Sequence, residues 1–211
     1  MARILITSGP TRQYIDPVRY LTNASSGRMG RALAQAAIDA GHEVTIVSGP
    51  VDIDYPPQAR VLRVVSTEEM LAACQEVFPD CDGLIGVAAP SDYRPMMVAT
   101  NKIAKTGEPL VLHLVETADV VATLGASKTR QWLVGFALET EDHRLRALAK
   151  LEKKHCDLMV LNGPEAMHAL DNNVEIVTHE GQVIEVISGS KDEVASGIFA
   201  VIDRRLIRGQ A

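Results

Sequence analysis

The sequence has no apolar segment long enough to cross a membrane, since none approaches the ~18 consecutive apolar residues that a span requires. Its first ten residues, MARILITSGP, contain a short apolar run that meets polar residues at once, which is unlike a secretory signal. We therefore expect a cytoplasmic protein that does not bind or enter membranes.

Cysteine is also scarce. The three cysteines, Cys74, Cys81 and Cys156, form no CxxC pair, and their odd number argues against a disulfide framework. We expect each to be a small buried side chain in a reducing compartment, and we assign no metal ligand in the chain.

An excess of positive charge is absent as well. The formal net charge is -6, which disfavours general binding to nucleic acids or anionic membranes. An anionic small substrate would need a local basic pocket.

The chain has 211 residues, of which 46% are hydrophobic and 23% are charged, an ordinary composition for a globular protein. We expect a single domain over residues 1–211.

Apolar runs alternate with helix-forming segments through most of the chain. Strands are predicted at residues 3–7, 42–50, 61–65, 83–89, 132–138 and 157–162, and helices at 27–40, 67–78 and 142–155. Such alternation predicts an α/β protein with a doubly wound, mostly parallel, Rossmann-like sheet and helices on both faces.

Two segments interrupt the alternation. Residues 110–115 are predicted to form an extra strand without a full helix before it, and residues 174–187 a hairpin that turns at Glu180-Gly181. A last helix is predicted at about 191–207. The extra strand and the hairpin are candidates for a homodimer interface, because an exposed sheet edge needs a cover.

The first strand and the first helix are separated by almost twenty residues, whereas such loops usually have ~2–6. Ser25, Ser26, Gly27 and Gly30 lie at the start of the helix, where free N–H groups and the helix dipole favour a phosphate. An equally good interpretation is that Ser25 or Ser26 is a plain N-cap and Gly30 serves only helix packing.

The run ITSGPTRQYIDPVRYLTNASSGRMG, residues 6–30, resembles the opening signature of phosphopantothenoylcysteine synthetases. This family is often fused to a flavin-dependent phosphopantothenoylcysteine decarboxylase, and the chain resembles the synthetase half alone. The second family motif resembles AAPSDYRP at 88–95. By itself this segment is better explained as a turn, but the resemblance implies that Ala88, Ala89, Asp92 and Asn23 bind the pantothenate moiety, and Ser25, Ser26 and Gly27 also belong to the substrate site.

Further segments carry the resemblance toward residue 190. NKIAKTGE at 101–108 is similar to a mobile lysine-rich loop, which implies a catalytic role beside Asn23 for Lys105 or, as a second choice, Lys102; Ala104 replaces a lysine common in the family. VGFALETED at 134–142, the helical lysines and the strand ending at Asn162 are similar to the nucleotide site. The residues implied there are Gly9, Phe136, Lys150, Lys154 and Asn162, with weaker matches at Asp171 and Asn173. Without the resemblance, a core role for Phe136 and a solvated face for the lysines are the simpler interpretations.

The resemblance implies a ligase of coenzyme A biosynthesis. It would join 4'-phosphopantothenate to cysteine through an acyl-nucleotide made from CTP, which we favour, or ATP, with Mg2+. Two alternatives remain: a non-catalytic nucleotide-binding regulatory module, and an NAD(P)-dependent oxidoreductase. The latter is disfavoured because Gly9 is far from Gly27 and no acidic residue ends the strand HEVTIV.

Overall fold

A computed structural model of the chain describes residues 1–138, 149–162 and 172–209. Its centre is an eight-stranded sheet in the order β12-β11-β10-β9-β6-β1-β4-β5. The six strands from β10 to β5 are parallel, and β11 and β12 are antiparallel. The bounds are β1 Arg3–Ser8, β4 Glu43–Ser48, β5 Arg60–Arg63, β6 Gly83–Gly86, β9 Trp132–Leu138, β10 Leu158–Asn162, β11 Asn172–Thr178 and β12 Val183–Gly189.

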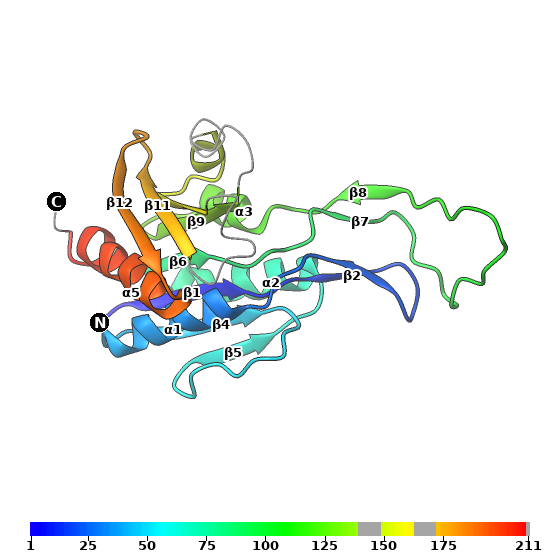
Figure 1. Cartoon of the computed structure of the whole chain (residues 1–211), viewed down its shortest axis with the longest axis horizontal. Coiled ribbons are helices and arrows are strands. Elements are labelled where there is room, and N and C mark those ends of the chain that lie inside the picture. Colours follow the sequence, from blue (N-terminus) through cyan, green and yellow to red (C-terminus); the bar gives the residue numbers. More distant parts are fainter. Residues whose placement is uncertain (139–148, 163–171, 210–211) are drawn as a thin grey trace.

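Helices cover both faces of this sheet (Figure 1). One face packs against α1 (Arg28–Asp39) and α5 (Lys191–Ile202), which continues into a π-helical turn at Asp203–Ile207. The other packs against α2 (Thr67–Val77), its 3-10 extension Phe78–Asp80, α3 (Val120–Ser127) and helical residues 149–153. Because successive strand side chains alternate, Ile4 and Ile6 of β1 enter the first core and Leu5 the second.

Two short antiparallel ribbons extend from the sheet. One is the hairpin of β2 (Arg12–Tyr14) and β3 (Tyr20–Thr22), and the other pairs β7 (Tyr93–Pro95) with β8 (Leu114–Glu116). In Figure 1 both project away from the sheet, on the side opposite the chain termini, and the connection between β7 and β8 reaches farthest.

The architecture confirms the predicted doubly wound α/β class, with four corrections. The strand expected at 83–89 ends at Gly86, because residues 87–92 turn away to form a loop. The strand expected at 110–115 is only Leu114–Glu116, and it pairs with β7 instead of the main sheet. Helix α3 and the ribbon strands β2, β3 and β7 were not predicted. The hairpin at 174–187 is confirmed, while its role in dimerisation stays a prediction.

The order in which the chain adds strands to the sheet reverses at β1. From β1 the chain passes to β4 on one side, and later to β6 on the other. At such a switch point the loops leave the carboxyl ends of neighbouring strands in opposite directions and open a crevice where α/β proteins bind ligands. Separately, none of the helices in the described part of the chain has the length and apolarity required to traverse a bilayer.

Candidate active site

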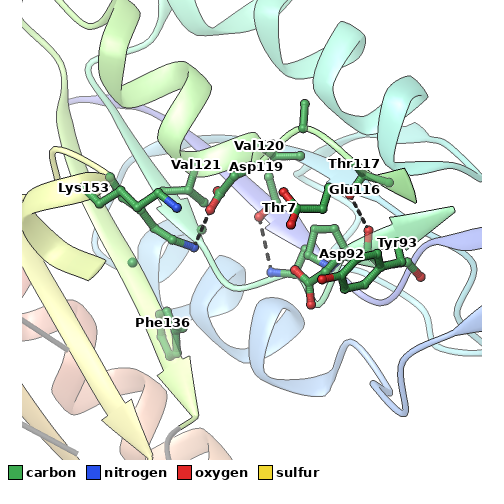
Figure 2. A pocket seen from close by; sticks show the side chains of 17 residues that line it. Thr7, Asp92, Tyr93, Glu116, Thr117, Asp119, Val120, Val121, Phe136 and Lys153 are labelled. Carbon is green, nitrogen blue, oxygen red and sulfur yellow. Dashed lines mark hydrogen bonds and ion pairs between the residues drawn. The ribbon is translucent and has the colours of Figure 1, made fainter. Parts of the chain in front are cut away.

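A cavity of about 290 Å³ lies beside the carboxyl ends of β1 and β6. The loop after β6 and the β7–β8 ribbon form one wall, and the start of α3, β9 and the end of the helix at 149–153 form the other. Figure 2 shows the first wall carrying Asp92, Tyr93, Glu116 and Thr117 and the second carrying Asp119 and Lys153. The volume is near the lower end of the range for small-molecule sites, ~300–1,000 Å³.

Asn23 ties the first loop to the wall after β6. Its Nδ2 donates hydrogen bonds to the carbonyl oxygens of Ala89, at 3.2 Å, and Pro90, at 2.9 Å. The Ala89 N–H donates to the Gly9 carbonyl at 2.9 Å, and the Ala88 N–H donates to Thr7 Oγ1 at 3.3 Å. Loops from β1 and β6 therefore form one hydrogen-bonded unit at the switch point.

The opposite wall carries an ion pair. Lys154 Nζ lies 3.0 Å from Asp119 Oδ2, while Asp119 Oδ1 accepts the Ala122 N–H at 3.0 Å as the N-cap of α3. Burial alone would raise the pKa of Asp119, but the Ala122 N–H and the ammonium groups of Lys154 and Lys153 hold this pKa below its ordinary value. Asp119 is therefore an anion that holds Lys154 beside the cavity, where Lys153 also lies.

Gly125 allows this pair to form. It faces the backbone of the neighbouring segment, and a Cβ at this position would overlap the Lys154 carbonyl oxygen. Only a glycine lets α3 approach so closely, and this approach is what brings Lys154 within reach of Asp119.

The start of α1 has no side-chain cap. Its N-cap residue is Gly27, in the left-handed region at φ 73°, where glycine carries no steric cost. The alternative in which Ser25 or Ser26 caps the helix is therefore wrong. The Gly27 carbonyl accepts a hydrogen bond from Ser8 Oγ at 3.2 Å, and Tyr55 Oη donates to Ser8 Oγ at 2.8 Å. Within the part of the chain that the structure describes, the N–H groups of the first turn have no side-chain acceptor, as an anion site requires.

The β2–β3 hairpin grips the connection between β7 and β8. Asp16, which is buried, accepts the Ile103 N–H at 3.1 Å, and Arg19 donates to the Ile103 carbonyl at 3.1 Å. Asp16 and Arg19 also pair with each other at 2.8 Å. Both backbone polar groups of Ile103 thus bond to one ion pair, which we call the Asp16–Arg19 clasp. Lys102 immediately precedes Ile103.

Comparison with known proteins shows the family to which this chain belongs. The family model described as "DNA/pantothenate metabolism flavoprotein C-terminal domain" matches residues 1–206. This chain belongs to that family. The crystal structure of the C-terminal domain of a "Coenzyme A biosynthesis bifunctional protein CoaBC" is 38% identical, with a TM-score of 0.83, and the match covers 98% of this chain and 96% of that one. The resemblance noted in the sequence is confirmed at the level of the family.

Two curated relatives of this chain are about twice its length. The Vibrio vulnificus CoaBC protein is 42% identical over 186 residues, which cover 85% of this chain and 46% of the relative. The Bacillus subtilis CoaBC protein is 40% identical over 204 residues, which cover 94% and 50%. The chain thus spans about half the length of the curated relatives it matches. A Cab2 variant, solved in complex with phosphopantothenate-cysteine, is 15% identical with a TM-score of 0.80 and supports the fold alone.

The cavity brings together some of the residues that this family resemblance indicated. Ala88, Asp92, Phe136 and Lys154 line it, and Asn23 contacts the same wall through Ala89. Glu116, Thr117, Asp119 and Lys153 line it too and were not predicted. Helical spacing predicts that Lys153 faces away from Lys150 and Lys154, and this prediction is wrong, because Lys153 lines the cavity beside Lys154. The acidic N-cap before an apolar run was a usable signal for Asp119.

Other predicted residues lie outside this cavity. Gly9, Ser25, Ser26 and Gly27 belong to the first loop and the start of α1, and Asn162 ends β10 at the carboxyl edge of the sheet. Lys150 is exposed on the helix, and Lys102 and Lys105 are exposed on the β7–β8 connection. Asn173 Oδ1 accepts the Ser188 hydroxyl across the hairpin at 3.2 Å. Asp171 lies outside the described residues.

Proposed function

We propose that this chain is a phosphopantothenate–cysteine ligase, which joins 4'-phosphopantothenate to cysteine through an acyl-nucleotide in coenzyme A biosynthesis. The observation that carries the proposal is one cavity with two unlike walls. The first wall presents the Asp92 carboxylate and the backbone groups that Asn23 holds in place. The second wall presents the side chains of Lys153 and Lys154. The first wall suits a hydroxyl- and amide-bearing acyl chain, and the second suits phosphates.

The first chemical step would be activation of the acid. A carboxylate oxygen of 4'-phosphopantothenate attacks the α-phosphorus of the nucleotide, a new P–O bond forms, and the bond to pyrophosphate breaks. Lys153 and Lys154 would neutralise the charge on the triphosphate, with Phe136 beside the base. Such transfer depends on positioning and charge neutralisation more than on a protein nucleophile.

The second step would form the amide. The neutral amine of cysteine attacks the activated carbonyl, the C–O bond to the nucleotide breaks, and the nucleoside monophosphate leaves as the amine loses a proton. Asn23, which holds the Ala89–Pro90 backbone, would orient the acyl group. Lys102 or Lys105 would approach the reacting phosphate from the β7–β8 connection. The Asp16–Arg19 clasp on Ile103 favours Lys102, because it fixes the adjoining backbone.

We propose Mg2+ as a companion of the triphosphate instead of a resident ion. The described residues contain no group of three His, Cys, Asp or Glu side chains placed to hold a metal. Asp92, Glu116 and Asp119 outnumber the two lysines of the cavity, so a bare triphosphate would meet net negative side-chain charge. A divalent cation bound to the phosphate oxygens would offset that repulsion. We propose CTP as the nucleotide, with ATP as the alternative that the assay must compare.

We further propose that the ligase acts as a homodimer through the β7–β8 ribbon and its connection. Exposed apolar side chains concentrate there, at Met96, Met97, Val98, Leu110, Val111, Leu112 and Leu114. A contiguous apolar surface of this kind marks an interaction site, and an isolated two-stranded ribbon is marginal in water. On the hairpin, by contrast, Val186 is the large apolar residue that is exposed. The product would pass to a flavin-dependent phosphopantothenoylcysteine decarboxylase.

Pyrophosphate release is the test of the proposed activity. Purified protein is incubated with 4'-phosphopantothenate, Mg2+ and either CTP or ATP, with and without cysteine, and products are identified by mass spectrometry. Release that requires 4'-phosphopantothenate, and the condensed product only when cysteine is present, is the expected result. Nucleotide binding without pyrophosphate release would instead support a regulatory module.

A further inference from the structure

Ser91 lies in the wall of the cavity, between Pro90 and Asp92, and is buried although it belongs to no strand. Its backbone groups are satisfied by side chains from distant parts of the chain. The Ser91 N–H donates to Thr11 Oγ1 at 2.8 Å, and the Ser91 carbonyl accepts from Thr67 Oγ1 at 3.2 Å and from Thr117 Oγ1 at 2.7 Å.

Counting protons fixes the direction of these hydrogen bonds. Thr67 has one hydroxyl proton, which it donates to the Ser91 carbonyl. Thr11 Oγ1 and Thr67 Oγ1 are 2.8 Å apart, so Thr11 must be the donor in that contact. The result is a closed ring that runs from the Ser91 N–H through the hydroxyls of Thr11 and Thr67 and back to the Ser91 carbonyl.

This ring holds the wall in one conformation. A buried amide or carbonyl without a partner is costly, and both backbone groups of Ser91 depend on the two threonines together with Thr117. Ser91 Oγ also donates to the Thr11 carbonyl at 3.4 Å, and the Thr117 N–H donates to the Asp92 carbonyl at 2.9 Å. Losing the ring would loosen Ser91 within this wall, while Asn23 and Gly9 still bond to its first half and Thr117 to its second.

Thr67 connects this wall to a rigid element. It is buried, it is the first residue of α2, and the helix is capped by Ser66 and Glu69, so the Thr67 hydroxyl is not needed as a cap. Thr67 does not line the cavity. We propose that Thr67 is a positioning residue, which acts through Thr11 and Ser91 to hold the Ala88–Asp92 wall in the geometry that binds the acyl substrate. This role rests on the proposed ligase function.

The test compares variants of Thr67 in the full chain. Thr67→Val keeps the shape and removes the hydroxyl, Thr67→Ala removes it without adding bulk, and Thr67→Ser keeps it. Losing such a bond corresponds to about a tenfold change, so kcat/KM for 4'-phosphopantothenate should fall by roughly that factor in the first two and recover in Thr67→Ser. The KM for the nucleotide should move by less than about twofold, because that substrate is assigned mainly to the other wall.

Two further measurements separate the possible outcomes. Amide hydrogen exchange at Ser91 should accelerate in Thr67→Val and stay slow in Thr67→Ser. Thr178→Val is the matched control, since the Thr178 hydroxyl is buried without a hydrogen-bond partner in the described part of the chain.

Faster amide exchange at Ser91 with unchanged kinetics in Thr67→Val would overturn the positioning role of Thr67. Equal losses of kcat/KM in Thr67→Val and Thr178→Val would overturn it as well. A wild-type chain that exchanges slowly at Ser91 but releases no pyrophosphate would overturn the ligase proposal, and this role with it, while leaving the ring intact.

Discussion

At the scale of single residues, Gly125 governs the position of Lys154. We expect Gly125→Ala to force α3 away from the Lys154 backbone, which weakens the Asp119–Lys154 pair. Overpacking of this kind costs ~1–3 kcal/mol, measurable as a shift of the urea midpoint. The KM for the nucleotide should rise as well, because Lys154 no longer faces the cavity correctly.

A neighbouring exposed position provides the control for this change. Ala126 is exposed on the same helix, so Ala126→Ser should alter stability by only a few tenths of a kcal/mol, from helix propensity. If both variants leave stability and the nucleotide KM at wild-type values, the close approach at Gly125 does not position Lys154.

Asp16 should give the fold a recognisable dependence on pH. Burial would raise the pKa of Asp16, but N–H donors from Val18, Ile103 and Arg19 and the Arg19 guanidinium hold it below the ordinary value of 3.8. A lowered folded-state pKa contributes stability that is fully present above the unfolded pKa and is lost as pH falls through the folded pKa.

The variant Asp16→Asn tests this directly. Urea unfolding of both proteins should show a stability difference that is constant from about pH 7 to about pH 5 and shrinks only below about pH 4. A difference that instead vanishes between neutral and mildly acidic pH would mean that Asp16 is not held as an anion by the clasp.

The lysines show what residue spacing can and cannot predict. Lys150 and Lys154 are four apart in the sequence, and this spacing predicts that they share one face of an ideal helix. In the structure the His155 N–H bonds to the Glu152 carbonyl, three residues back, and His155 has φ 52°. Lys154 still makes the α-helical bond to the Lys150 carbonyl, and the helix ends directly after it; Lys153 and Lys154 line the cavity, whereas Lys150 does not.

At the scale of elements, α1 and α2 begin in different ways. Ser66 and Glu69 form a capping box on α2, whereas no side chain caps α1. We expect Ser66→Ala to lower the free energy of unfolding by ~1 kcal/mol, while Ser25→Ala and Ser26→Ala change it little. Thermal unfolding of the three variants measures the contrast, and a loss at Ser25 or Ser26 as large as at Ser66 would show that one of them stabilises the start of α1.

Long elements were predictable and short ones were not. The strands and helices of the main sheet carry apolar runs or periodic faces that are visible in the sequence. The three-residue strands β2, β3, β7 and β8 are defined by pairing partners, and β8 pairs with residues about twenty positions earlier. Helix α3 has only eight residues and includes Gly125, which lowers its helix propensity. The loop after β6 looked like a continuing strand because its residues are apolar, but the Asn23 and Ser91 contacts that bend it are non-local.

At the scale of the whole molecule, the exposed apolar residues of the β7–β8 connection and the cavity of the candidate active site lie on the same side of the sheet. The ribbons leave the sheet at its carboxyl edge, where the cavity lies, and the termini lie on the other side (Figure 1). The Asp16–Arg19 clasp joins the two ribbons, so burial of the β7–β8 connection against a second copy would also immobilise Lys102. Assembly and catalysis should therefore be coupled.

The last prediction tests that coupling. Met97 is 83% exposed and Val111 is 72% exposed, both on the β7–β8 connection, so Met97→Glu and Val111→Lys should leave the fold unchanged and disrupt the proposed dimer. Each would bury a charge in an apolar interface, which costs several kcal/mol unless the charge is paired. Sedimentation should show monomers, and ligase activity should fall and recover partly at high protein concentration by mass action. Val186→Lys on the hairpin is the control, because 57% of that residue is exposed outside this connection. Dimers that persist in both ribbon variants but dissociate in Val186→Lys would move the interface to the hairpin.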